Sequence, residues 1–231
     1  MQALLIRHAQ ADWGGSRYDR LSDRGRRQAA QLGRWLAGSP DWRPQRLLCG
    51  PRRRHRDTVQ AIRAAYRAAG IATPAVEVEP DWDDGDAEAL LRAFRSTYPD
   101  APELAYVAAG ATAAQGRALL RVVFAAWRSG RLDADMPERW DAFAARVARA
   151  RAALAAQPCA QVLVVSSAGA IARCAQAALR LDDAALVELN VRLANAALAL
   201  FSIEENQWYL EAWNLQPLVC AGADAELASS H

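Results

Sequence analysis

The chain has 231 residues, of which 52% are hydrophobic and 23% are charged, and its formal net charge is +2. This balance supplies enough apolar material for a core, and it excludes a disordered chain and a strongly charged binder of nucleic acid or anionic membranes. All 28 basic residues are arginine, which excludes chemistry on a Schiff-base lysine or a P-loop lysine. The length predicts a single domain over residues 1–231.

The first part of the sequence alternates short apolar runs with amphipathic stretches, which predict strands and helices in turn. Ser22 is a suitable N-cap for the first helix, and Gly38, Ser39 and Pro40 end it. The expected order is a strand at residues 2–6, a helix after Ser22, a strand at 46–49, a helix at 53–69, a strand at 76–78 and a helix at 86–97.

The second part continues the alternation. We expect helices at residues 113–127 and 137–156, a buried strand at 161–165, a helix ending near Leu179, and strands at 196–203 and 208–213. This pattern predicts an α/β fold of three layers, α/β/α, with a mostly parallel sheet and helices on both faces. Residues 98–139 are expected to form a helical cap insertion, and the small polar tail at 221–231 is expected to be flexible.

The cysteines and histidines are scattered along the chain. No Cys-x-x-Cys pair and no metal-ligand spacing occurs among Cys49, Cys159, Cys174, Cys220, His8, His55 and His231. We therefore expect no metal and no cofactor, and a reducing compartment. No apolar run approaches the roughly 20 residues that span a bilayer, and a strand beginning near Met1 leaves no room for a signal peptide. These features predict a cytoplasmic protein that binds neither membrane nor nucleic acid.

Polar side chains follow three of the predicted strands. Arg7 and His8 come after the first strand, a run ending at Arg54 follows the second, and Ser166 and Ser167 end the strand at 161–165. The carboxyl ends of parallel strands share one edge of a sheet, where binding sites form. An arginine guanidinium binds two phosphate oxygens, and a neutral histidine can attack phosphorus. The sequence therefore predicts a phosphate site at this edge.

These residues and their surroundings resemble the histidine phosphatase superfamily, the phosphoglycerate mutase-like proteins. Arg7-His8-Ala9 is similar to the Arg-His-Gly signature, and LSDRGRRQA, from Leu21 to Ala29, is similar to the following helix start. The segment GPRRRHRDTVQAI matches a second block, with Thr58 fixing the register. The ordered blocks RHAQADWG, YDRLS, WDDGD, SSAG and WNLQPLV resemble a bacterial subgroup that has serine in place of the second catalytic histidine.

The resemblance implies a phosphoglycerate mutase-like fold and phosphoryl transfer through a phosphohistidine intermediate. His8 would be the nucleophile, and Arg7 and Arg54 would clamp the phosphoryl oxygens. Ser167 and the backbone amide of Ala168 would donate further hydrogen bonds to the phosphate. The family also uses an acidic residue that protonates the leaving oxygen and then activates water.

The identity of this acid depends on the register of the alignment. Matching WDDGD to the family places Asp84 at the position of the acid, whereas a register counted from Gly85 selects Asp81, and Asp83 lies between them. The plain alternative is a solvated loop with Asp86 capping the next helix. We assign the catalytic role to Asp84, and note that aspartate is one methylene shorter than the glutamate of the family.

Several family features are absent from this sequence. No histidine stands at Ser167 or at Leu218, the two positions where relatives place a second imidazole. His55 follows Arg54 on the predicted helix, and we interpret it as a surface or helix-face residue that points away from the site. Ala9 replaces a glycine and adds a methyl group that disfavours a glycine-like backbone conformation. Loss of a transition-state donor costs about 10²- to 10³-fold, so these departures predict attenuated activity.

Two functions are compatible with the pattern. The first is a phosphatase acting through His8 on a small phosphomonoester or on a phosphohistidine of a partner protein. The second is a catalytically silent protein that keeps the fold and binds a phosphate ligand. Retention of Arg7, His8 and Arg54 favours the phosphatase, because a site that only binds phosphate has no chemical need for the nucleophile. The sequence selects no particular substrate and no oligomeric state.

Overall fold

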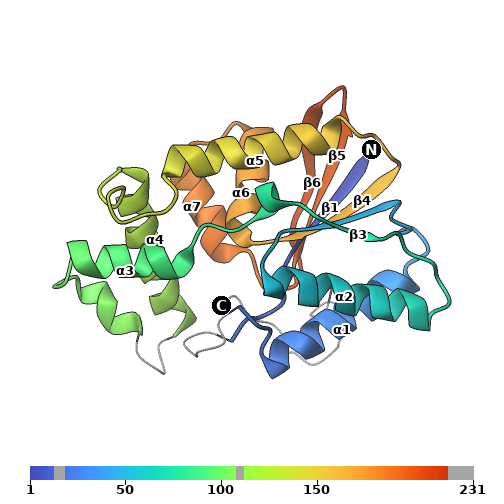
Figure 1. Ribbon diagram of the computed structural model, residues 1–231, viewed down its shortest axis with the longest axis horizontal. Helices are drawn as coiled ribbons and strands as arrows, with labels where there is room; N and C mark the ends of the chain where they lie inside the picture. The colour runs from blue at the N-terminus through green and yellow to red at the C-terminus, as the bar shows by residue number, and fades with distance from the viewer. Residues whose placement is uncertain (13–18, 108–111, 218–231) are drawn as a thin grey trace.

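A six-stranded sheet forms the centre of the computed structural model, which describes residues 1–12, 19–107 and 112–217 (Figure 1). Its strands are β1 (Gln2–Arg7), β2 (Arg46–Cys49), β3 (Val76–Val78), β4 (Gln161–Ser166), β5 (Leu198–Glu204) and β6 (Gln207–Leu215). The α-helices are α1 (Asp23–Gly38), α2 (Arg53–Ala68), α3 (Ala87–Thr97), α4 (Ala113–Arg128), α5 (Trp140–Ala155), α6 (Ala168–Leu179) and α7 (Asp183–Arg192). Two short 3₁₀ segments are η1 (Pro80–Trp82) and η2 (Pro102–Val107).

The strand order is β3-β2-β4-β1-β5-β6. The strands β3, β2, β4 and β1 pair in parallel, whereas β5 pairs with β1 and β6 in antiparallel fashion. The register sets Arg7 opposite Ser166 and Cys49 opposite Val165. Parallel pairing therefore brings the residues that follow β1, β2 and β4 to the same edge of the sheet.

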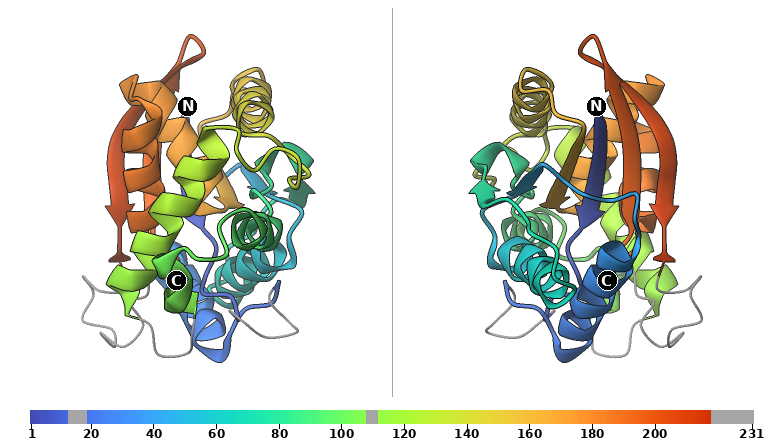
Figure 2. Two further views of the ribbon diagram at one scale, coloured as in Figure 1. Left: turned by 90° about the vertical axis from the view of Figure 1, so that its left-hand side faces the viewer. Right: turned by 90° about the vertical axis from the view of Figure 1, so that its right-hand side faces the viewer.

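The sheet separates two apolar cores, as predicted for a three-layer α/β/α fold. In β1, Leu4 and Ile6 pack with residues of α1 and α2, whereas Ala3 and Leu5 face the core that includes α4, α5 and α6. This alternation follows from the period of two along a strand. Figure 2 shows α1 and α2 side by side and the β5–β6 hairpin at the outer edge of the sheet.

The helix starts agree with the capping residues in the sequence. Ser22 accepts a hydrogen bond from the Gly25 amide at 3.0 Å, and Asp86 accepts one from the Ala89 amide at 2.9 Å. Such side chains satisfy amides that have no partner within the helix. The predicted strands and helices are confirmed to within a few residues at their ends, the largest difference being α5, which begins at Trp140.

Helix α7 and the two 3₁₀ segments were not expected from the sequence. Asp182 caps α7 by accepting from the Ala185 amide at 2.8 Å, and this N-cap signal was available in the sequence. With only ten residues, the helix is too short for its apolar period to stand out. The predicted flexible tail at 221–231 lies outside the described residues.

The segment expected to be a cap, residues 98–139, contains η2 and α4. In Figure 1, α3 and α4 lie together at the end of the molecule that is remote from the amino end of β1. Of the helices that the structure describes, none combines the length and the apolar character needed to cross a bilayer.

Candidate active site

His8 lies directly after β1, at the carboxyl edge of the sheet, and its side chain is buried. Its backbone amide donates to the Ser166 carbonyl at 2.8 Å, and its carbonyl accepts from the Asn195 side chain at 3.2 Å. The ring atom Nδ1 lies 2.8 Å from the Ala9 carbonyl oxygen. A carbonyl can only accept, so Nδ1 carries the proton and Nε2 keeps its lone pair.

The surroundings of His8 hold its pKa well below the usual 6.5. Burial is the largest cause, followed by the positive charge of Arg54, and His55 and Arg7 act in the same direction. Burial and nearby cations both disfavour the imidazolium form. His8 is therefore neutral near pH 7, and a neutral imidazole with an unprotonated Nε2 is the form that can attack phosphorus.

Arg54, in the first turn of α2, is only 2% exposed and reaches three acceptors. Its Nε donates to Nε2 of His8 at 3.2 Å, its Nη1 pairs with Asp19 at 3.1 Å and its Nη2 pairs with Asp84 at 2.9 Å. Oxygens of two carboxylates thus occupy the guanidinium edge that could hold phosphoryl oxygens. Asp19 also accepts from the Arg53 amide at 2.8 Å, at the N-terminus of α2.

Thr58 connects the end of β1 to α2. Its Oγ1 accepts from the Ala9 amide at 3.1 Å and donates to the Arg54 carbonyl at 2.8 Å. The hydroxyl is buried, so the two bonds connect the segment next to His8 with Arg54 at one rigid point. The φ angle of Ala9 is not in the left-handed region, so the added methyl group of alanine does not strain the backbone, contrary to the expectation from the sequence.

Arg7 is the last residue of β1, and its guanidinium Nη1 donates to the Leu193 carbonyl in the segment between α7 and β5. The side chain is close enough to His8 for its charge to lower the pKa of that histidine. The structure thus places Arg7 beside His8, while Arg54 is the arginine that donates a hydrogen bond to the His8 ring.

The three candidate acids point in different directions. Asp84 pairs with Arg54 beside His8, whereas Asp83 pairs with Arg52 at 2.8 Å and Asp81 pairs with Arg149 at 3.1 Å. The Asp84 side chain is 21% exposed, so it borders both the buried histidine and solvent. Of the three carboxylates, Asp84 is the one that the fold brings to the nucleophile.

Arg146 and Gly169 hold the loop that carries Asp84. Arg146 donates to the carbonyls of Asp83 and Asp84, at 2.9 and 3.3 Å, and is itself paired with Glu138. A Cβ atom on Gly169 would lie 3.5 Å from Oδ1 of Asp84, so this carboxylate packs against the first turn of α6. The loop position is therefore fixed from α5 and α6 together.

His55 is not a surface residue, and the expectation that it points away from the site is wrong. Its side chain is fully buried, its ring centroid lies 5.5 Å from that of His8, and its Nε2 lies 2.7 Å from Oγ of Ser167. The first turn of α2 is enclosed between the end of β1 and the end of β4, so successive residues of that turn are both buried. Ser167 precedes Ala168, the first residue of α6.

Sequence reasoning assigned no role to Asp19 or His55. Asp19 belongs to the YDRLS block, which resembled the family, and His55 adjoins the phosphate-clamp arginine. Both signals were present, but the contact of each side chain with the site depends on the tertiary packing around α2.

The family model of the histidine phosphatase superfamily (branch 1) matches residues 3–216. The chain belongs to the histidine phosphatase superfamily. Membership in the histidine phosphatase superfamily supports an enzyme of phosphatase or mutase type that acts on small phosphorylated substrates. No curated protein matches the chain.

Solved structures share the fold of this histidine phosphatase superfamily member at low sequence identity. An alpha-ribazole phosphatase from Shigella flexneri is 20% identical, with a TM-score of 0.61 over 93% of this chain and 96% of its own. A mycobacterial glucosyl-3-phosphoglycerate phosphatase in complex with inorganic phosphate is 24% identical, with a TM-score of 0.62 over 93% and 97%. A phosphoglycerate mutase from Bacillus anthracis is 15% identical, with a TM-score of 0.64 over 97% of each chain.

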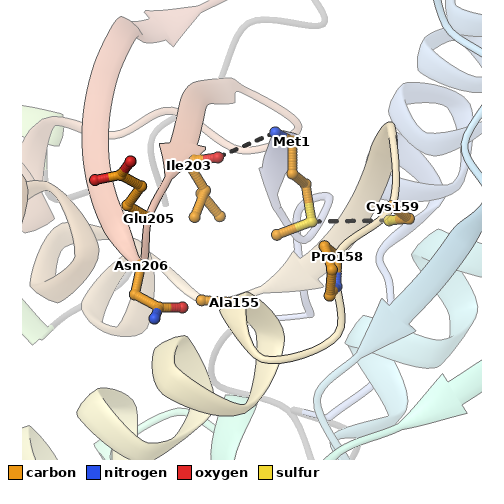
Figure 3. Close-up of a pocket in the computed structure, with 7 residues that line it drawn as sticks. All are labelled: Met1, Ala155, Pro158, Cys159, Ile203, Glu205 and Asn206. Atoms are coloured by element: carbon orange, nitrogen blue, oxygen red, sulfur yellow. Dashed lines mark hydrogen bonds between the residues drawn. The ribbon is translucent and has the colours of Figure 1, made fainter.

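A separate cavity of about 410 Å³ lies beside Met1, Cys159 and Ile203 (Figure 3). Met1 and Cys159 precede β1 and β4, so this cavity is at the amino ends of the parallel strands, away from His8. The Met1 ammonium donates to the Ile203 carbonyl at 3.0 Å, and the Cys159 thiol lies 3.8 Å from the Met1 sulfur. None of the lining residues that the structure describes is arginine or histidine, so this cavity does not suit phosphoryl transfer. Among the described residues, no group of three His, Cys, Asp or Glu is arranged to hold a metal ion.

Proposed function

We propose that this chain is a phosphatase that hydrolyses a phosphomonoester, or a phosphohistidine on a protein, through a phosphohistidine intermediate on His8. The observation that carries the proposal is the hydrogen bonding of that ring. Nδ1 contacts the Ala9 carbonyl, and Nε2 accepts from the guanidinium of Arg54. A phosphoryl group whose oxygens take up the Arg54 donors would lie next to Nε2 and release its lone pair for attack.

In the first step, phosphoryl oxygens replace the carboxylates of Asp19 and Asp84 as acceptors of the Arg54 guanidinium. Nε2 of His8 then forms a bond to phosphorus as the bond to the ester oxygen breaks. Arg7, beside the same strand end, and the backbone amide of Ala168 add positive potential around the transferred group. The charge on the phosphoryl oxygens is thus balanced within the site.

Asp84 is the acid and base in this scheme. Displaced from Arg54 by the phosphoryl group, Asp84 takes the proton that the substrate monoanion carries and gives it to the leaving oxygen in the first step. Its carboxylate then takes a proton from water as water attacks the phosphohistidine. The phosphate then leaves with the proton balance restored. The position of Asp84 supports this role, since it touches Arg54, packs against Gly169 and borders solvent.

The experiment compares wild type and His8→Asn with p-nitrophenyl phosphate as substrate. We expect turnover in the wild type, a loss of at least 10³-fold in the variant, and an acid-labile, base-stable phosphoryl label on the wild-type chain after rapid quenching. Equal activity in both proteins would overturn the proposal. Phosphate binding without His8-dependent turnover would instead identify the silent phosphate-binding protein that the sequence also allowed.

The substrate class is tested by comparing phosphoryl donors that differ in their leaving group. A panel of small phosphomonoesters and one phosphohistidine peptide, each assayed for kcat/KM, separates the two proposed substrate classes. A preference for a small phosphorylated substrate is consistent with membership in the family.

A further inference from the structure

The buried pair His55 and Ser167 has no role in the scheme above. His55 lies on α2 and Ser167 follows β4, and 112 residues separate them in the chain. Their side chains meet at 2.7 Å, both residues are at most 1% exposed, and the His55 ring lies 5.5 Å from the His8 ring. Removing these two polar side chains from water costs free energy, which the hydrogen bond between them must offset. Their position beside His8 suggests a chemical role for the pair.

Ser167 stands at the N-cap position of α6, but its hydroxyl does not cap the helix. An N-cap serine ordinarily accepts from an amide of the first turn. Here Oγ is turned toward Nε2 of His55 instead. The hydroxyl is therefore held by the imidazole at a helix N-terminus, a place that favours anions.

The chain makes room for this ring at Gly50. A Cβ atom on residue 50 would lie 2.4 Å from Nδ1 of His55 and 2.4 Å from the Trp82 carbonyl oxygen. A side chain at this position would collide with both the imidazole and the Trp82 carbonyl, so one of the groups would have to move. The turn after β2 therefore packs directly against the His55 ring and depends on glycine to do so.

We propose that His55 orients the Ser167 hydroxyl as a hydrogen-bond donor to the phosphoryl group, so that the two residues together supply a transition-state donor. This inference rests on the proposed phosphoryl transfer at His8. His55 is a positioning residue, because it acts through Ser167, and Ser167 is the group that touches the phosphoryl oxygen.

The direction of the hydrogen bonds follows from the charge of the ligand. A phosphoryl oxygen only accepts, so the Ser167 O–H donates to it, and Oγ accepts from Nε2–H of His55. The relay requires the neutral tautomer of His55 that carries its proton on Nε2 and leaves Nδ1 unprotonated. Burial, followed by the charges of Arg54 and Arg52, lowers the pKa of His55 well below its usual value, which keeps the ring neutral. These hydrogen bonds orient the Ser167 hydroxyl without any transfer of a proton between His55 and Ser167.

The test is a double-mutant cycle on the full chain. We expect Ser167→Ala to lower kcat about 10²-fold, as for loss of one transition-state donor, and His55→Phe to lower it about 10-fold or more. In the Ser167→Ala background, His55→Phe should change kcat by less than about threefold, because its effect passes through the missing hydroxyl. His55→Gln, whose amide can donate to Oγ, should recover a large part of the loss, and Arg56→Ala, an exposed position on the same helix, is the matched control.

A binding experiment separates this inference from the proposed function. Vanadate mimics the transition state, whereas inorganic phosphate does not, so His55→Phe and Ser167→Ala should weaken vanadate binding by at least tenfold more than phosphate binding. This comparison holds even if the wild type shows no turnover, which would overturn the phosphatase proposal alone. Unchanged vanadate affinity, additive losses in the cycle, or failure of His55→Gln to recover activity in a folded protein would each overturn the His55 inference. An acid-stable phosphoryl label would also overturn it, because Ser167 would then be the nucleophile.

Discussion

Nε of Arg54 donates a hydrogen bond to Nε2 of His8 at 3.2 Å, so the arginine that we propose as a phosphate ligand also contacts the lone pair of the proposed nucleophile. The positive charge of Arg54 keeps the pKa of His8 low, after the larger effect of burial. Arrival of a phosphoryl group gives the guanidinium a better set of acceptors and leaves Nε2 directed at phosphorus. In the proposed reaction, the binding of phosphate oxygens by Arg54 therefore also frees Nε2 of His8 from its hydrogen bond.

Asp84→Asn tests the identity of the acid. An acid that protonates the leaving oxygen matters most when that oxygen is a poor leaving group. We expect the variant to lower kcat/KM by at least 10²-fold for an alkyl phosphate and much less for p-nitrophenyl phosphate. Asp81→Asn, which removes only the exposed pairing with Arg149, should stay within about threefold of wild type on both substrates. Equal losses on both substrates would argue against Asp84 as the proton donor.

Asp19→Asn tests whether the Asp19 carboxylate competes with phosphate for the guanidinium of Arg54. The Asp19 carboxylate occupies Nη1 of Arg54 and adds negative charge near the proposed phosphate position. The substitution should tighten the binding of inorganic phosphate, by about three- to tenfold in calorimetric Kd, since the like charge is lost and the amide oxygen that remains is a weaker competing acceptor. Asp57→Asn is the control, because Asp57 forms an exposed pair with Arg53 on the same helix. Weaker phosphate binding by Asp19→Asn would show that Asp19 mainly holds α2 in place.

Thr58→Val tests the link between β1 and α2. The change leaves the Ala9 amide and the Arg54 carbonyl without the hydroxyl that bridges them, and an unsatisfied buried amide costs about 1–3 kcal/mol. We expect the free energy of unfolding to fall by that amount and kcat to fall at least tenfold, because His8 and Arg54 lose their shared anchor. Thr58→Ser keeps the hydroxyl and should retain most of both quantities. Wild-type kcat in Thr58→Val would contradict the link.

Stability should fall when the solution is made mildly acidic. His8 and His55 both have a pKa lowered well below 6.5, so below that pH the unfolded chain binds protons that the folded chain does not. The free energy of unfolding should therefore decrease as pH falls from about 6.5, by up to about 1.4 kcal/mol per pH unit for each histidine. Urea denaturation at pH 7.5 and pH 5.0 measures the change.

The carboxylate of Glu188 does not explain a loss in this window. Arg121 holds the pKa of Glu188 low, at about 2, so its contribution is present above its ordinary value of 4.5 and is lost only at more acid pH. A variant carrying His8→Gln and His55→Gln should show a flatter profile between pH 7.5 and pH 5.0. A flat profile in the wild type would mean that the two imidazoles titrate normally in the fold.

Local patterns were sufficient for most of the fold. The apolar run before Arg7 predicts a central strand, and the Ser22 and Asp86 caps mark helix starts, because these signals depend on residues close together in the chain. Helix α7 was missed since its short apolar face gives little periodicity, and its packing within the core is a tertiary property.

By itself, the sequence determined the order of the strands and of the α-helices other than α7, and the residues at the strand ends, including Arg7, His8 and Arg54, because strand termini and motif spacing are local features. Tertiary structure alone decided that Asp84 rather than Asp81 or Asp83 faces Arg54, and that His55 is buried against Ser167. The physical reason is that these contacts join segments far apart in the chain, and the packing around the first turn of α2 sets which of them reach it.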